Sequence, residues 1–328
     1  MGAVALKETV CYAVQPENSH TSVMMDEVVD LLRVKPGGVY VDGTVGLGGH
    51  SAAILGKIQA DGLLIGVDRD KESLAKADER LKKVSGAFRL IHDNFKNLPL
   101  ALNRLSIEAI DGVLLDLGVS SWQLLSADRG FSFHSDAMLD MRMDRTQSRT
   151  AADIVNETPE TELADIIYQY GEERFSRRIA AAIVNDRETA PITRCAQLAG
   201  IVSRVIPARG RWNIHPATRT FQALRIAVNE ELRGLEEFLL ETARFLKPNG
   251  RLVVIAFHSL EDRIVKRAFR KLAGQCVCDA PPELCRCERR VSAKILTSRP
   301  MTPGSEELTA NPRARSARLR VVEKIQTG

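Results

Sequence analysis

The sequence lacks any apolar run that approaches the roughly 20 residues of a membrane-spanning helix, so we expect no membrane association. Residues 1–19 lack a basic segment followed by an apolar core, and no secretory signal is therefore predicted. The same stretch holds one Lys, no Arg and two Glu, which argues against a mitochondrial presequence. Cysteine is scarce: six residues, four of them within 276–287, do not make a secreted disulfide scaffold. These absences predict a protein of a reducing cytoplasm.

What the chain does have is length and a regular alternation of apolar patterns. Its 328 residues suffice for about two domains with a substantial core, and its net charge of +4 is too mild to indicate nucleic acid by itself. From residue 39 onward, continuous apolar runs alternate with amphipathic stretches, which predicts a parallel sheet covered on both faces. The expected strands are 39–42, 63–68, 88–91, 112–116, 251–257 and 318–322. The expected helices are 50–58, 71–84, 97–105, 174–187, 194–205 and 221–246.

The alternation stops at residue 117, where a polar stretch and then helical patterns take over. Thr158 followed by Pro159 predicts a helix start, with Thr158 as the N-cap, and 248–250 (Pro-Asn-Gly) predicts the turn that ends the last helix. We therefore predict a mostly helical domain inserted into an α/β domain. The expected parts are an N-terminal extension (1–19), the first part of the α/β domain (20–123), the inserted domain (124–215) and the second part of the α/β domain (216–328).

The most informative short stretch is Val39–Ser51, with the sequence VYVDGTVGLGGHS. A strand-like run ends at Asp42, four glycines follow within seven residues, and helical spacing begins directly afterwards. In parallel sheets such a turn lies at the carboxyl end of a strand, where nucleotides bind. Glycines at 46, 48 and 49 would let the backbone approach a ligand closely. The turn predicts a nucleotide-like ligand without specifying which, and a turn that merely connects strand to helix is the alternative.

Three of the predicted strands end in an acidic residue. Asp68 lies 19 residues beyond Gly49, at the place where an acid can accept hydrogen bonds from a ribose. Asp116 ends the fourth strand, beside the first strand and its Asp42. We therefore expect the three carboxylates to face one crevice. For Asp68 alone, a role as a turn or helix-cap residue is the alternative.

A near-match to the dinucleotide-binding motif Gly-x-Gly-x-x-Gly opens another interpretation. It falls on Gly46, Gly48 and Ser51, so the third glycine is missing. No Ser/Tyr/Lys or Cys/His group suited to hydride transfer stands out. An NAD-dependent oxidoreductase therefore stays as an alternative.

Arginine dominates the charge from Arg174 to Arg219, which holds nine Arg, no Lys and two carboxylates. Guanidinium groups suit bidentate phosphate contacts and stacking on bases. The segment favours contact with nucleic acid, and an ordinary solvated helix face is the alternative.

Several longer motifs, taken together and in this order, resemble one known family. They are DGTVGLGGHS (42–51), DGVLLDLGVSS (111–121), RGFSF (129–133), LDMRMD (139–144), YGEER (170–174), HPATRTFQALR (215–225) and FHSLEDR (257–263). The chain resembles the ribosomal RNA small subunit methyltransferase H (MraW-like) family over residues 20 to about 270, and again over 311–322.

This resemblance implies a Rossmann-like class I S-adenosyl-L-methionine-dependent methyltransferase fold with an inserted helical domain that helps to recognise the substrate. It implies N4-methylation of a decoding-centre (P-site) cytidine of 16S rRNA, with the rRNA or the small ribosomal subunit as partner. An RNA-binding assembly factor that holds the cofactor without turnover is the alternative. Asp68 is expected to bind the ribose hydroxyls and Phe95 to lie against the adenine. The cofactor contacts that the motif match carries over are Gly48, Gly49, His50, Asp68, Phe95, Asp116 and Gln123.

Asp116 is also the candidate catalytic residue. The exocyclic amine of cytidine is a poor nucleophile because its lone pair is delocalised into the ring, so a group that accepts its N–H and later its proton would help. Many amino-group methyltransferases carry Asp/Asn-Pro-Pro-Tyr/Phe at this position, whereas this chain has Asp-Leu-Gly-Val over 116–119, without the aromatic residue. We expect Asp116 and the backbone carbonyls after it to accept the amine.

Some residues admit a structural role as readily as a functional one. Phe131 and Phe133 are candidate clamps for an unstacked cytidine, or aromatic residues of the insert's core. His215 and His258 are expected to be structural or RNA-contacting rather than catalytic. The four cysteines at 276, 278, 285 and 287 have a spacing tighter than that of common zinc sites. Both a bound metal and a reduced surface loop remain open there.

Overall fold

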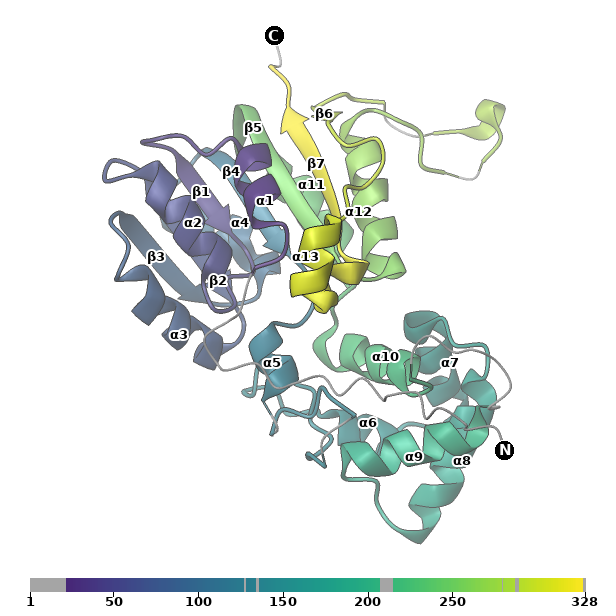
Figure 1. The fold of residues 1–328 in the computed structure, drawn as a ribbon. Coiled ribbons are helices and arrows are strands. Elements are labelled where there is room, and N and C mark those ends of the chain that lie inside the picture. Colours follow the sequence, from purple (N-terminus) through teal and green to yellow (C-terminus); the bar gives the residue numbers. More distant parts are fainter. Residues whose placement is uncertain are drawn as a thin grey trace, which may run out of the picture.

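The computed structural model describes residues 22–126, 128–133, 136–206, 215–278, 280–286 and 289–326. The strands of this part of the chain are β1 Val39–Asp42, β2 Leu63–Asp68, β3 Ala87–His92, β4 Ile110–Asp116, β5 Leu246–Ala256, β6 Ala293–Ile295 and β7 Arg318–Lys324. They form one seven-stranded sheet in the order β3-β2-β1-β4-β5-β7-β6 (Figure 1). Neighbours from β3 to β5 are parallel, whereas β7 is antiparallel to both β5 and β6. This doubly wound order confirms the predicted Rossmann-like α/β fold.

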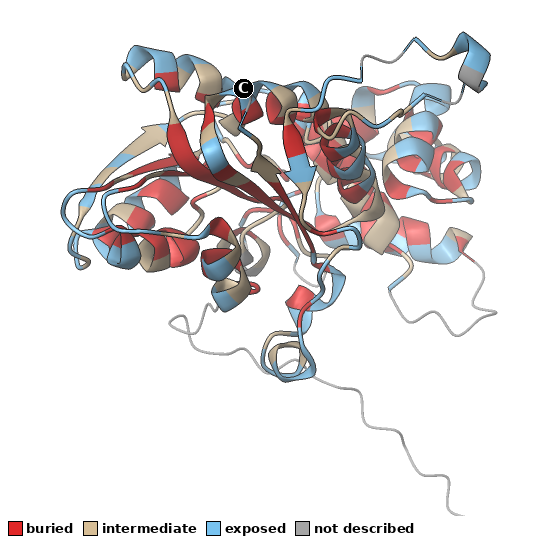
Figure 2. Ribbon diagram, turned by 90° about the horizontal axis from the view of Figure 1, so that it is seen from above, coloured by how far each residue is buried: buried red, intermediate tan, exposed pale blue. Residues whose placement is uncertain are grey.

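Helices cover both faces of the sheet. They are α1 Met25–Leu32, α2 Gly49–Ile58, α3 Lys71–Leu81, α4 Leu98–Arg104, α11 Leu235–Phe245 and α12 Ser259–Leu272. On β4, Val113 and Leu115 share a core with α4, α11 and α12, whereas Leu114 between them shares one with α1, α2 and α3. Figure 2 shows the buried strands between these layers. Because successive side chains point to opposite faces, a strand covered on both needs the continuous apolar run seen in the sequence.

A second core lies next to the sheet, below it in Figure 1, and is built mainly from helices. These are α5 Ser121–Leu125, α6 Ala151–Glu157, α7 Glu160–Gly171, α8 Ser176–Thr189, α9 Cys195–Val205 and α10 Thr218–Asn229. Ile154, Ile167 and Ile183 belong to this core and come from three of these helices. Among the described residues, no helix of either region has the length and apolar character needed to cross a membrane.

The predicted long helix over 221–246 is wrong, because α10 and α11 are separate helices. Between them Glu230 and Gly234 have φ angles of 47° and 73°, and a left-handed backbone ends an α-helix. Phe221 and Leu224 of α10 are buried in the helical core rather than against the sheet. We therefore propose that the inserted region extends to Asn229, beyond the boundary at 215 expected from the sequence.

Two smaller boundaries also differ from the prediction. Thr158 does not cap the helix that follows it: it ends α6, and α7 begins at Glu160. The predicted turn at 248–250 lies inside β5, where the pairing with β4 shifts register between Leu246 and Arg251. A bulge absorbs the extra residues of one strand without ending it.

Polar contacts join the two cores. Arg129 is 1% exposed and donates to Asp70 Oδ2 at 2.9 Å, and Gln123 Nε2 donates to the same oxygen at 2.7 Å. Breaking such a buried pair costs about 3–5 kcal/mol, since the remaining charge is left without a partner. A separate link runs from Arg263 of α12 to Glu172 after α7, at 3.0 Å. These contacts hold the helical region against the carboxyl edge of the sheet.

Candidate active site

A cavity of about 290 Å³ lies at the carboxyl ends of β1, β2 and β4. The glycine turn after β1, Asp68 and Asp116 line it from the sheet, and Arg225 lines it from the helical region. Parallel α/β sheets bind their ligands at this edge. The volume is near the roughly 300 Å³ at which small-molecule pockets begin. The cavity is therefore the candidate active site.

Glycine is required at several positions of the turn after β1. Gly46 and Gly48 have φ angles of 53° and 77°, in the left-handed region that other residues rarely adopt. A Cβ on Gly49 would lie 1.9 Å from Ser22 Oγ. A Cβ on Gly48 would lie 3.2 Å from Cβ of Ala77 on α3. Gly49 lines the cavity, whereas Gly48 packs against α3 and does not line it.

Asp68 holds the glycine turn in position. Its Oδ2 accepts a hydrogen bond from Gly46 N at 2.7 Å, and its Oδ1 accepts one from Asp70 N at 2.8 Å. Burial raises the pKa of Asp68 to about 6, against these two hydrogen bonds. Each oxygen keeps a second lone pair, and the side chain lines the cavity, so Asp68 can still accept hydroxyl groups from a ligand. The helix-cap role falls on Asp70, which accepts the N–H groups of Glu72 and Ser73.

The prediction that three carboxylates face one crevice is wrong for Asp42. It is 1% exposed and does not line the cavity. Its oxygens accept hydrogen bonds from Ser51 Oγ at 2.6 Å and Thr44 N at 3.1 Å, which tie the turn to α2. Burial raises the pKa of Asp42 to about 6 despite both bonds. The residue is structural, and it carries an electrostatic cost when ionised.

We expect Asp42→Asn to change how stability depends on pH. The folded carboxyl titrates at a pKa of about 6 and the unfolded one near 4, so the folded state binds more protons between these values. The wild-type free energy of unfolding should therefore fall as pH rises through that window, by up to about 3 kcal/mol from this group. The free energy of unfolding of the variant should not contain this decrease. Urea unfolding at pH 4.5 and 7.5 should therefore show that the stability of the variant relative to the wild type is higher at pH 7.5. An equal difference at both values would contradict the assignment.

Asp116 and His50 lie together at the cavity. The pKa of Asp116 lies well above its ordinary value because of burial and the nearby charges of Asp42 and Glu261. His50 Nε2 donates to the carbonyl of Val23 at 2.9 Å, which leaves Nδ1 as an acceptor 3.7 Å from Asp116 Oδ2. Burial lowers the pKa of His50 to about 4, so the ring is neutral and this contact is not an ion pair. The side chain of Asp116 remains 24% exposed and can be reached from the cavity.

Phe95 and Gln123 also line the cavity, as predicted cofactor contacts should. The Phe95 ring meets Phe238 of α11 edge to face at 5.0 Å, which fixes its orientation. Gln123 is 4% exposed, and its Oε1 accepts from Ser120 N at 3.0 Å while its Nε2 is bonded to Asp70. Gln123 thus also has a structural role, and its contact with the cofactor stays a prediction.

Several residues that line the cavity have no role predicted from the sequence. Arg225 and Glu231 form a bidentate pair with both N···O distances at 2.9 Å. Burial opposes ionisation of Glu261, but His258, Arg225 and a backbone N–H together hold its pKa below the ordinary value. Arg313 lines the cavity from near the C-terminus. Arg225, Glu261 and Arg313 all lie in segments that carry the family resemblance, and this was the available signal.

The aromatic and histidine candidates divide between core and surface. Phe131 is 7% exposed within the helical core, which supports its packing role. The ring of Phe133 stacks on exposed His215, with centroids 4.4 Å apart and planes inclined by 17°. His258 Nδ1 accepts from Glu261 N at 3.4 Å and caps α12, a structural role as expected.

The doubly wound sheet, the glycine turn and an acid at the end of β2 define a nucleoside-binding α/β enzyme. Residues 17–325 match the MraW methylase family, and the chain belongs to this family. It is therefore a methyltransferase that uses S-adenosyl-L-methionine. The NAD-dependent oxidoreductase alternative is left without support.

Two named relatives are similar in sequence to this chain over nearly their whole length. The protein called ribosomal RNA small subunit methyltransferase H from Citrifermentans bemidjiense is 53% identical over 308 residues, which cover 93% of this chain and 98% of that protein. The protein of the same name from Halothermothrix orenii is 48% identical over 309 residues, 93% of this chain and 98% of that protein. Among solved structures, an rRNA methylase from Streptococcus thermophilus aligns with a TM-score of 0.38 at 13% identity, covering 92% of this chain and 94% of that one.

Proposed function

We propose that this protein methylates N4 of a P-site cytidine in the 16S rRNA of the small ribosomal subunit, in the cytoplasm. The names of the relatives support ribosomal RNA as the substrate. The observation that supports an amine acceptor is the Asp116 carboxyl group, whose side chain lines the cavity and is 24% exposed there. Carboxylate oxygens are acceptors only, so this group fits an N–H donor supplied by a ligand in the cavity. The exocyclic amine of cytidine offers such N–H groups.

The cavity residues fit S-adenosyl-L-methionine. Asp68 would accept the ribose hydroxyls, Phe95 would provide an apolar wall for the adenine, and Gly49 and His50 would lie along the rest of the molecule. When bound, this cofactor supplies a methyl group on a positively charged sulfur, which is a strong electrophile.

The protein's own part of the chemistry centres on Asp116. A hydrogen bond from the amine to the Asp116 carboxylate favours the geometry in which the amine lone pair leaves conjugation with the ring. The same carboxylate then takes the proton that the methylated amine releases, and a raised pKa makes it a stronger base than an ordinary aspartate. Neutral His50 is held by the Val23 carbonyl, and its Nδ1 lies 3.7 Å from Asp116 Oδ2, beyond hydrogen-bond distance.

Turnover separates this function from that of an assembly factor that holds the cofactor without reacting. We expect tritiated methyl transfer from S-adenosyl-L-methionine to 16S rRNA in small subunits, with N4-methylcytidine as the labelled nucleoside after digestion. Tight cofactor binding with no transfer to naked rRNA, immature subunits or complete subunits would favour the assembly factor.

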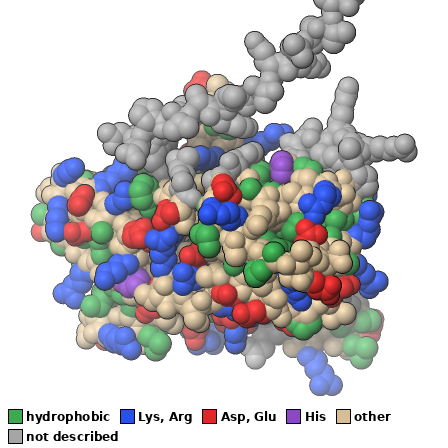
Figure 3. All heavy atoms as spheres, turned by 90° about the horizontal axis from the view of Figure 1, so that it is seen from below, with side chains coloured by type: hydrophobic (Ala, Val, Ile, Leu, Met, Phe, Trp, Pro, Cys, Tyr) green, Lys and Arg blue, Asp and Glu red, His purple; other side chains and the backbone are tan. Residues whose placement is uncertain are grey.

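The arginines of the inserted region have mixed roles. Arg187 donates to the carbonyls of Val155 and Thr158, and Arg204 pairs with Asp186 at 2.6 Å, so both support the fold. Arg209 and Arg211 lie outside the described residues. Figure 3 shows basic side chains spread over one face among acidic ones rather than in one continuous patch. The exposed pair Arg177 and Arg178 at the start of α8 is therefore our candidate RNA contact.

Replacing Arg177 and Arg178 together with Ala should weaken RNA binding and leave cofactor affinity intact. If each contacts one phosphate of unpaired RNA, the salt dependence of log K should flatten by about 1.4. Filter binding at several salt concentrations measures this. The matched control is Lys82→Ala with Lys83→Ala, an exposed pair just beyond α3 that should not alter the slope. Equal behaviour of the two double variants would contradict the proposed contact.

A further inference from the structure

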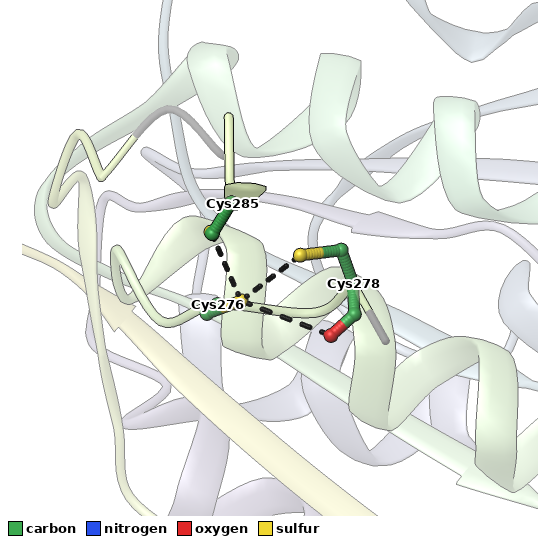
Figure 4. A group of neighbouring side chains, drawn as sticks. All are labelled: Cys276, Cys278 and Cys285. Carbon is green, nitrogen blue, oxygen red and sulfur yellow. Dashed lines mark hydrogen bonds between the residues drawn. The ribbon is translucent and has the colours of Figure 1, made fainter. Parts of the chain in front are cut away.

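Three cysteine side chains converge in the segment that connects α12 to β6. Cys276 Sγ lies 3.4 Å from Cys278 Sγ and 3.4 Å from Cys285 Sγ. Figure 4 shows the three side chains directed toward one another. A disulfide bond would bring two sulfurs to about 2.05 Å, so these pairs are thiols in close contact. Cys287, the fourth member of the cluster in the sequence, lies outside the described residues.

The sulfur positions match the ligand geometry of a tetrahedral metal site. With zinc–sulfur bonds of about 2.3 Å, neighbouring sulfurs of a tetrahedral site lie about 3.8 Å apart. The three Sγ atoms lie within 4.8 Å of one another, with two separations of 3.4 Å, so a zinc ion requires only small side-chain adjustments. Thiolates are soft ligands that favour zinc over magnesium or calcium.

The described residues of the surrounding segment, between Ala273 and Val291, contribute no buried apolar side chain to a core. Its two ends are joined by a bridge between Ala273 and Val291 and by the Ser292 N–H, which donates to Leu272 O at 2.8 Å. None of the described residues between these ends belongs to a buried core, and Leu284 is 70% exposed. The segment spans residues 274–290, and connections of this length with little regular structure are uncommon in compact domains. Small units without a core usually depend on a disulfide or a metal.

We propose that Cys276, Cys278 and Cys285 bind one zinc ion as a structural site that fixes this segment. The thiols lose their protons to solvent when the metal binds, so affinity should rise with pH. Three thiolates leave a fourth coordination position for a further ligand. The site lies apart from the cofactor cavity, whose lining includes no residue of this segment. Its role is therefore independent of the methyl-transfer chemistry.

Metal content of the purified full chain tests the proposal. Wild-type protein from zinc-supplemented cells should hold about one zinc per chain by mass spectrometry of the metal. Cys276→Ser and Cys285→Ser should each lose it. The matched control is Cys195→Ser, a buried cysteine of the helical core whose Sγ contacts Gly130 O at 3.3 Å, and it should keep the metal. Wild type without zinc, or zinc retained in both cluster variants, would overturn the proposal.

A second measurement uses the unmodified protein and does not depend on how the variants fold. Chelator treatment should make the segment over 275–290 cleavable by a protease, whereas titration with S-adenosyl-L-methionine should give the same affinity before and after. Added zinc should restore protection. Unchanged cleavage, or a disulfide among these cysteines with no metal in protein purified under reducing conditions, would refute the site.

Discussion

Replacing Asp116 with Asn should lower the rate of methyl transfer by about 10²- to 10⁴-fold, the usual contribution of a positioned acid or base. Asn keeps an oxygen that can accept a hydrogen bond from the amine but cannot take its proton. Single-turnover transfer to small subunits measures the rate, and calorimetric titration measures cofactor affinity. The rate should fall far more than the affinity, because the proton moves only during the reaction.

The pH profile gives this prediction a second readout. Burial and two neighbouring carboxylates raise the pKa of Asp116, so part of the wild-type enzyme is protonated at low pH and cannot act as a base. The wild-type rate should rise with pH through that pKa, and the variant should lack this rise. The matched control is Asp111→Asn at the other end of β4, where the carboxylate pairs with Lys247 at 2.7 Å. It should cost stability and leave the pH profile unchanged. A rising limb retained in Asp116→Asn would remove this residue from the proton transfer.

Replacing Asp68 with Ala should weaken binding of S-adenosyl-L-methionine at least tenfold. Hydrogen bonds to a charged acceptor contribute about 1.5–3 kcal/mol, and the substitution also leaves the N–H groups of Gly46 and Asp70 without their acceptor. The loss should appear as a higher dissociation constant in calorimetric titration.

The control for Asp68 is Asp61→Ala, an exposed acid just before the start of β2. It removes the same charge from the opposite edge of the sheet and should leave cofactor affinity unchanged. Asp68→Asn should fall between the two, because it keeps one acceptor oxygen. Wild-type affinity in Asp68→Ala would place the ribose elsewhere in the cavity.

Most of the sheet could be predicted from the sequence, because central strands such as β4 are buried on both faces and consist of continuous apolar runs. The edge strand β6 was not predicted, since its three residues are too few to form a recognisable pattern. The end of α10 could not be predicted from the sequence. Its apolar spacing continues through Phe221 and Leu224 into that of Leu235 and Phe238, although the two helices belong to different cores. The periodicity of apolar residues indicates that a residue is buried. It does not indicate in which core the residue is buried. Gly234 was the local signal, and a single glycine inside an amphipathic pattern does not specify a break.

The candidate site was predictable where its residues lie at the ends of strands. Asp68, Asp116 and Gly49 follow from the position of a glycine turn in a parallel sheet, and all three line the cavity. Asp42 also ends a strand, but its carboxylate is buried and accepts hydrogen bonds from Ser51 and Thr44. This difference depends on local geometry. Segments that are distant in the chain also line the cavity. Ser22, Arg225 and Arg313 reach it only through the tertiary fold, which spacing alone does not encode.

The nucleotide that receives the methyl group tests the central proposal most directly. Small subunits lacking the modification would be incubated with the enzyme and labelled S-adenosyl-L-methionine, and the 16S rRNA would be digested and mapped by mass spectrometry. We predict one labelled nucleotide, a P-site cytidine methylated on N4, and none with Asp116→Asn. A label at another position, on a ring carbon or on a ribose oxygen would contradict the proposed reaction.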